Sequence, residues 1–93
     1  MIHLDIEREA LLILQEECAE VSQAISKIFR FGYDSTFNDL NNRQMLEQEL
    51  GDLFQLVEIL LERNVIDLDN LHIAMAKKKA KLKIWSTHLK EIL

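Results

Sequence analysis

The feature that most constrains this chain is the near absence of residues that interrupt helices. Its 93 residues include no proline and only two glycines, Gly32 and Gly51. Proline ends or kinks a helix, and folds rich in strands need turns built on Gly and Pro at short intervals. Leu, Ile, Ala, Glu, Lys and Gln, most of which favour helices, are abundant instead. The sequence therefore predicts an all-α fold, and its length suits one small domain over residues 1–93.

Turn-forming and capping residues divide the chain into three predicted helices, a helical bundle. Residues 30–39 collect Gly, Asp, Ser and Asn, which predicts a loop after the first helix. Asn41 or Asn42 can then cap the second helix. The three predicted helices run from about residue 4 to 29, from about 43 to 63, and from a cap at Asp67 or Asp69 to about 89.

Two pairs of acids lie within or beside the apolar faces of the first two predicted helices. Successive residues on a helix are 100° apart, and this phase places Glu17 and Glu49 inside the apolar arcs. Glu20 and Asp52 fall at the borders of the same arcs. Burying an ionised carboxylate without a partner costs several kcal/mol. Four converging carboxylates with no basic residue beside them therefore indicate a bound cation.

The spacing of these acids suits a metal site. Side chains three residues apart on a helix are neighbours, so each pair can direct two carboxylates at one point. One such pair is ordinary on a solvated helix, whereas two pairs that each have an inward member are not. Oxygen ligands suit Mg²⁺, with Mn²⁺ as a substitute. The di-iron bundles use Glu-x-x-His pairs, and the histidines at 3, 72 and 88 are not spaced in that way.

The two acid-rich segments also resemble a family signature. Residues 14–21 read LQEECAEV and residues 47–55 read EQELGDLFQ. They are similar to the EExxE…ExxD motif of the MazG-like all-α nucleoside triphosphate pyrophosphohydrolases. The resemblance implies a Mg²⁺-dependent hydrolysis between the α and β phosphates of a nucleotide, which gives a monophosphate and pyrophosphate. Carried over by position, it implies four metal ligands: Glu17, Glu20, Glu49 and Asp52.

Other residues are expected to serve catalysis or substrate binding. Glu16 matches the first acid of the motif, but its outward phase favours a role in orienting water or a ligand. One of the carboxylates could act as the base. Loop aromatics could stack a base, although they more often fold onto the core. The predicted contacts to substrate, each with an exposed side chain as the ordinary alternative, are Lys27, Arg30, Lys78 and Lys79 for phosphates and Asn38 for a base edge.

The charge pattern limits the partners and the compartment. Residues 1–73 carry fifteen acids against five bases, within a net charge of −5, which disfavours stable binding to nucleic acids. Residues 74–93 hold six lysines and one acid, typical of a solvated helix face or of a surface that attracts phosphate. No apolar run reaches the length of a membrane span. A single cysteine cannot form an internal disulfide, so we expect a cytoplasmic protein.

Three helices of this length cannot bury all of the chain's apolar side chains. Leu12, Ile73 and Ile84 fall outside the buried arcs, and Gly51 would permit the close approach of another helix. We therefore expect a bundle completed by oligomerisation, as a homodimer or a homotetramer formed as a dimer of dimers. Within the same fold, a phosphoribosyl-ATP pyrophosphohydrolase or a dUTPase-like enzyme is an alternative. From a different class, the alternative is a noncatalytic helical interaction module whose acids bind structural metal or none.

Overall fold

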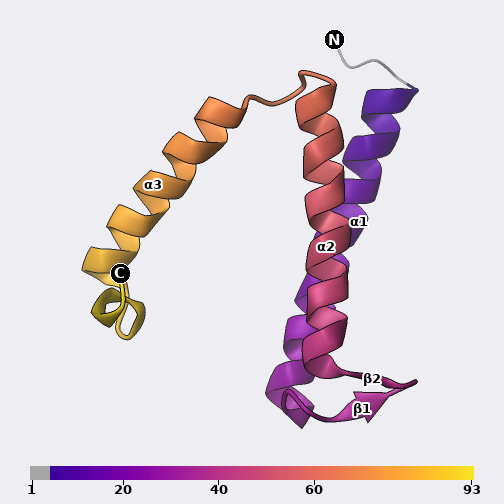
Figure 1. The fold of residues 1–93 in the computed structure, drawn as a ribbon, viewed down its shortest axis with the longest axis vertical. Helices are drawn as coiled ribbons and strands as arrows, with labels where there is room; N and C mark the ends of the chain where they lie inside the picture. The colour runs from indigo at the N-terminus through magenta and orange to yellow at the C-terminus, as the bar shows by residue number, and fades with distance from the viewer. Residues whose placement is uncertain (1–4) are drawn as a thin grey trace.

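The computed structural model describes residues 5–93 and consists of three long helices with one short hairpin (Figure 1). The elements are α1 (Ile6–Phe31), β1 (Thr36–Phe37), β2 (Leu40–Asn41), α2 (Asn42–Glu62), α3 (Leu68–Trp85) and a short 3₁₀ helix (Leu89–Glu91). The all-α class and the three helices are thus confirmed. The predicted start of the first helix at Leu4 lies outside the described residues. Among residues 5–93, no helix combines the length and apolar character needed to cross a membrane.

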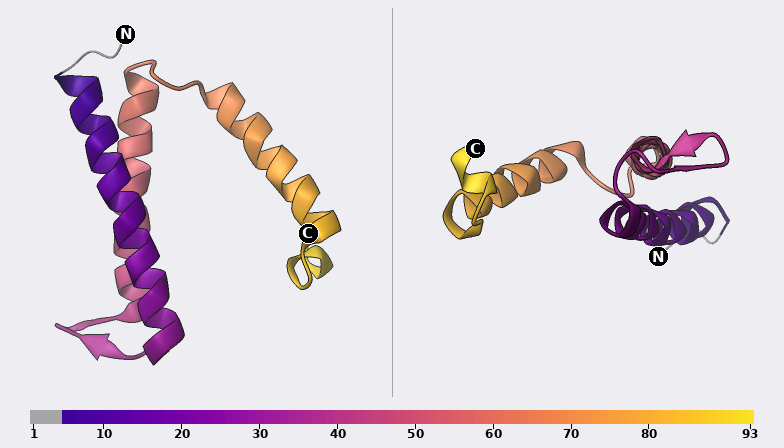
Figure 2. Two further views of the ribbon diagram at one scale, coloured as in Figure 1. Left: turned by 180° about the vertical axis from the view of Figure 1, so that it is seen from behind. Right: turned by 90° about the horizontal axis from the view of Figure 1, so that it is seen from below.

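Helices α1 and α2 lie side by side and antiparallel, and they form the main contact of the fold (Figures 1 and 2). Within the described chain, the buried apolar side chains are those of Ala10 and Ala24 on α1 and Leu60 on α2. Two alanines on one face let the helices approach closely. The core is therefore a narrow seam between two helices, and side chains beside it are only half-buried.

A tight hairpin joins α1 to α2, where the sequence predicted only a loop. Strands β1 and β2 are antiparallel and two residues long. The residues between them, Asn38 and Asp39, have φ angles of 52° and 68°. Two successive positive φ angles are typical of a type I′ turn, in which Asn and Asp are favoured. The prediction missed the hairpin because strands this short show no periodicity, although the Asn-Asp pair was its signal.

Two adjacent asparagines fix the start of α2. Asn41 caps the helix in a capping box: its Oδ1 accepts from the Gln44 N–H at 2.7 Å, and the Gln44 side chain accepts from the Asn41 N–H at 3.0 Å. The Asn42 side chain is 4% exposed. Its amide donates to the Gly32 carbonyl at 2.9 Å and, at the limit of a hydrogen bond, to the Lys27 carbonyl at 3.5 Å. Asn42 thus fastens the end of α1 to the beginning of α2.

Helix α3 extends away from the α1–α2 pair (Figures 1 and 2). Its first turn is capped by Asp67, whose carboxylate accepts from the Asn70 N–H at 3.1 Å. The sequence predicted a helix to about residue 89, but the α-helix ends at Trp85 because Ser86 adopts an extended conformation. No residue of α3 is buried, and Trp85 is 81% exposed. The chain is accordingly flat, with extents of 42 × 39 × 15 Å.

Candidate metal centre

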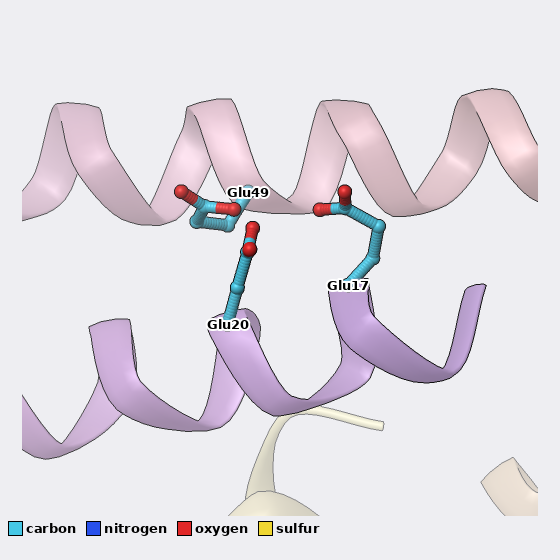
Figure 3. Close-up of side chains that lie close together, drawn as sticks. All are labelled: Glu17, Glu20 and Glu49. Atoms are coloured by element: carbon cyan, nitrogen blue, oxygen red, sulfur yellow. The ribbon is translucent and has the colours of Figure 1, made fainter. Parts of the chain in front are cut away.

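Three carboxylates meet in the middle of the α1–α2 seam. Glu17 and Glu20 come from consecutive turns of α1, and Glu49 comes from the facing turn of α2 (Figure 3). One carboxylate oxygen of each residue lies within 4.8 Å of the others. The spacing of three residues puts Glu17 and Glu20 on one face of α1, and the antiparallel packing brings Glu49 opposite them. The structure therefore brings together three of the four acids that the sequence grouped.

The environment of these acids opposes their ionisation. Glu17 and Glu49 are half-buried, and Oε2 of each is buried without a hydrogen-bond partner. Burial raises the pKa of Glu17, and the charges of Glu20 and Asp52 raise it further. The hydrogen bond that a protonated Glu49 makes with Glu20 raises the pKa of Glu49 to about 7, with further contributions from burial and from the charges of Glu20, Asp52 and Glu17. Every contribution raises these two pKa values and so disfavours the ionised form. The three acids therefore need a bound cation or a proton to offset their charge.

A divalent metal ion is the partner that these residues fit. The two unpaired buried oxygens of Glu17 and Glu49 are strong acceptors with nothing to accept from among residues 5–93. Buried polar groups are almost always paired, and a polar atom without a partner needs an explanation. Since the donor atoms are carboxylate oxygens alone, hard cations such as Mg²⁺ or Mn²⁺ suit the group better than zinc or copper.

The other two predicted catalytic acids lie at the edge of this group. Asp52 is exposed and is not one of the three acids whose oxygens approach within 4.8 Å. Its charge nevertheless raises the pKa of both Glu17 and Glu49, so it lies within electrostatic reach. Glu16 is exposed and is the weakest contributor to the raised pKa of Glu17. The ligand role of Asp52 and the orienting role of Glu16 stay predictions.

A small cavity of about 220 Å³ adjoins the acids. It is lined by Glu20, Gln23, Ala24, Lys27, Met45 and Glu49. By helical phase Gln23 and Lys27 fall on the side of α1 away from its apolar arc, yet both line this cavity and Lys27 is only half exposed. Lys27 was among the predicted phosphate contacts. Gln23 was not, and its signal was its position three residues after Glu20 on the helix. Of these six lining residues, only Lys27 has a cationic side chain, and it lies at the hairpin end of the group of acids.

The remaining predicted substrate residues are dispersed. Arg30, at the end of α1, is exposed, and its guanidinium lies 5.2 Å from the centroid of the Phe31 ring. Asn38 occupies the hairpin turn. Lys78 and Lys79 are exposed on α3, and within one chain α3 lies away from the acids (Figure 1). A contact between these two lysines and a substrate at the acids would need a second chain.

The family model described as the MazG nucleotide pyrophosphohydrolase domain matches residues 7–84. That range contains all of α2 and nearly all of α1 and α3, and therefore every acid discussed above. No curated protein and no solved structure matches the chain.

Proposed function

Because the chain belongs to the MazG nucleotide pyrophosphohydrolase family, we propose that it hydrolyses a nucleoside triphosphate between the α and β phosphates. The products are a nucleoside monophosphate and pyrophosphate. The observation that carries the proposal is the group of Glu17, Glu20 and Glu49, whose carboxylates converge with two buried oxygens unpaired. Without a cation, these carboxylates would repel a polyphosphate. With Mg²⁺ or Mn²⁺ between the carboxylates and the phosphates, the group would bind the polyphosphate instead.

Each residue of the site then has a distinct role. Glu17, Glu20 and Glu49 hold the ion, and Asp52 adds a fourth carboxylate from the next turn of α2. An ion held by these carboxylates would supply positive charge to offset the charge that develops on the phosphate oxygens. Glu16, exposed beside Glu17, orients the ligands or the attacking water. Lys27 donates hydrogen bonds to phosphate oxygens at the edge of the cavity that it shares with Glu20 and Glu49.

A homodimer or a dimer of dimers completes the fold in this proposal. Within the described chain, large apolar side chains remain exposed, including Phe29 at 86%, Ile84 at 71% and Trp85 at 81%. Apolar surface on this scale favours association, at about 25 cal/mol for each Å² buried. The charges are complementary as well, because the lysines of α3 and the acids of α1 and α2 have opposite sign. A second chain could in this way bring Lys78 and Lys79 to the phosphates.

An assay of pyrophosphate release tests the function. The enzyme is incubated with Mg²⁺ and a panel of ribo- and deoxyribonucleoside triphosphates that includes dUTP, with phosphoribosyl-ATP as a separate substrate. We expect release that EDTA abolishes and that Glu49→Gln lowers by about 100-fold or more. Glu47→Gln is the matched control, because Glu47 is an exposed glutamate on the same helix. A chain that binds a helical partner and releases pyrophosphate from no nucleotide under any metal condition would be an interaction module, and the proposal would be wrong.

A further inference from the structure

A second cavity lies beside the metal centre, at the hairpin end of the α1–α2 pair. Its volume is about 400 Å³, within the range of about 300–1,000 Å³ typical of small-molecule sites. It is lined by Lys27, Phe31, Ser35, Thr36, Phe37 and Asn42. Resting on the proposed function, we propose that this cavity holds the nucleobase of the substrate and that Phe37 is the ring on which the base stacks.

Lys27 lies between the two cavities. It lines the cavity of the acids and also the cavity of the aromatic rings. Its ammonium group lies 5.9 Å from the centroid of the Phe37 ring. On one side of Lys27 are carboxylates suited to a metal–phosphate complex, and on the other are aromatic rings suited to a flat heterocycle. A nucleotide has these two kinds of chemistry at its two ends.

The aromatic rings are available to a ligand. Phe31 and Phe37 are 62% and 63% exposed, although both line the cavity. A cation lies over each ring, Arg30 at 5.2 Å from the Phe31 centroid and Lys27 at 5.9 Å from the Phe37 centroid. Phe37 is the better stacking surface because its cation, Lys27, also lines the cavity of the acids. Phe37 belongs to β1, which the hairpin holds against β2. Because the backbone of Phe37 is held in a hydrogen-bonded hairpin, little backbone entropy is lost when a base stacks on its ring.

The polar lining predicts weak discrimination between bases. Stacking accepts any base, since every base has a π face. The amide hydrogens of Asn42 are directed at the carbonyls of Gly32 and Lys27, so this side chain is not positioned to donate to a base. Hydrogen bonds to the base edge would then come from the hydroxyl groups of Ser35 and Thr36, which can both donate and accept. We therefore expect one cavity to accept both purines and pyrimidines.

The test compares two ligands that differ in the base. Binding of a nucleoside α,β-methylene triphosphate and of inorganic tripolyphosphate is measured by calorimetry with Mg²⁺. We expect the wild-type protein to bind the nucleotide analogue about 5-fold to 150-fold more tightly than tripolyphosphate. In Phe37→Ala this ratio falls to about one, while the affinity for tripolyphosphate is unchanged. Phe54→Ala is the matched control, because Phe54 is also 63% exposed but does not line the cavity.

A second variant guards against misfolding of Phe37→Ala. Phe37→Trp keeps a stacking surface, and its fluorescence is expected to be quenched by the nucleotide analogue and unaffected by tripolyphosphate. The inference would be overturned if the wild-type affinity ratio were about one, or if Phe37→Ala kept the wild-type ratio. It would also be overturned if the nucleotide analogue and tripolyphosphate changed the fluorescence of Phe37→Trp equally. So would a Phe37→Ala variant that changes only the oligomeric state, which would assign the cavity to a second chain. These results do not depend on turnover: a protein that shows the expected ratios but hydrolyses no nucleotide would refute the proposed function and support the base site.

Discussion

Without its metal, this protein is expected to become less stable as the pH rises toward neutrality. In the folded chain the pKa of Glu49 is raised from 4.5 to about 7. A carboxyl group whose pKa is higher in the folded state stabilises that state below its unfolded pKa, and this stabilisation is lost as the pH rises through the folded pKa. Without metal, the free energy of unfolding should therefore decrease between about pH 4.5 and pH 7.

The size of this effect follows from the pKa of Glu49. A shift from 4.5 to about 7 corresponds at most to about 3.5 kcal/mol, at about 1.4 kcal/mol for each pKa unit. Because Glu49 is only half-buried, water screens part of this interaction, and we expect about 1–2 kcal/mol. For a domain of this size, that corresponds to a decrease in Tm of about 5–15 °C.

Bound Mg²⁺ should remove the decrease. A ligand present at about 100 times its Kd stabilises the folded state by about 2.7 kcal/mol. The carboxylates that repel one another at neutral pH are then the metal ligands, so the gain from Mg²⁺ should be large near pH 8 and small near pH 5, where protons compete for the same oxygens.

Thermal melts followed by circular dichroism at one protein concentration test this reasoning, with EDTA or with excess Mg²⁺. Glu49→Gln should melt at a higher temperature than wild type in EDTA near pH 8, should show a flatter pH profile, and should gain less from Mg²⁺. Glu47→Gln, with its exposed side chain, should behave as wild type. A wild-type Tm in EDTA that rises from pH 4.5 to pH 7, or an equal response of both variants, would refute the argument.

Further predictions concern the seam, the hairpin and α3. Leu60→Ala should lower the free energy of unfolding by about 2–5 kcal/mol in urea titrations, because Leu60 is 2% exposed. Asn42→Ala should cost about 1–3 kcal/mol in the same assay, because it leaves the Gly32 carbonyl without its donor. Asp39→Gly should raise the free energy of unfolding by no more than about 1 kcal/mol, seen as a small increase in Tm, because φ at this position is 68° and glycine adopts a positive φ without strain. If α3 packs on a second chain, Trp85→Glu should reduce the mass measured by sedimentation equilibrium, and an unchanged mass would place the interface elsewhere.

The helices were predictable because their signals are local. The absence of proline and the capping residues defined three helices, and Asp67 caps α3 as one of two expected positions. Helical phase also directed Glu17 and Glu49 toward the seam, where the structure places them. Each of these inferences depends on residues within one or two turns of each other, and the sequence displays such relations directly.

The relations between helices were harder to predict. Phase gives the direction of a side chain from its own helix axis, but not where the partner helix lies along that direction. Phase alone therefore places Gln23 and Lys27 away from the apolar arc of α1, although both line the cavity beside the acids. Helical phase predicted a buried arc on α3 that excludes Ile73 and Ile84, but no residue of α3 is buried, because its apolar and charged residues are distributed around its axis.

The separation of α3 from the α1–α2 pair also bears on how the chain folds. Helices α1 and α2 are joined by residues 32–41, which contain the hairpin, so the contacts between their adjoining ends lie close in sequence and can form rapidly in one molecule. Within residues 5–93, the main contact of helix α3 is with the short 3₁₀ helix at Leu89–Glu91 and not with another long helix. On the proposed association, its docking is a bimolecular step whose rate depends on protein concentration. The helical hairpin would then be the first folding unit, and α3 would acquire its full protection from hydrogen exchange only after assembly.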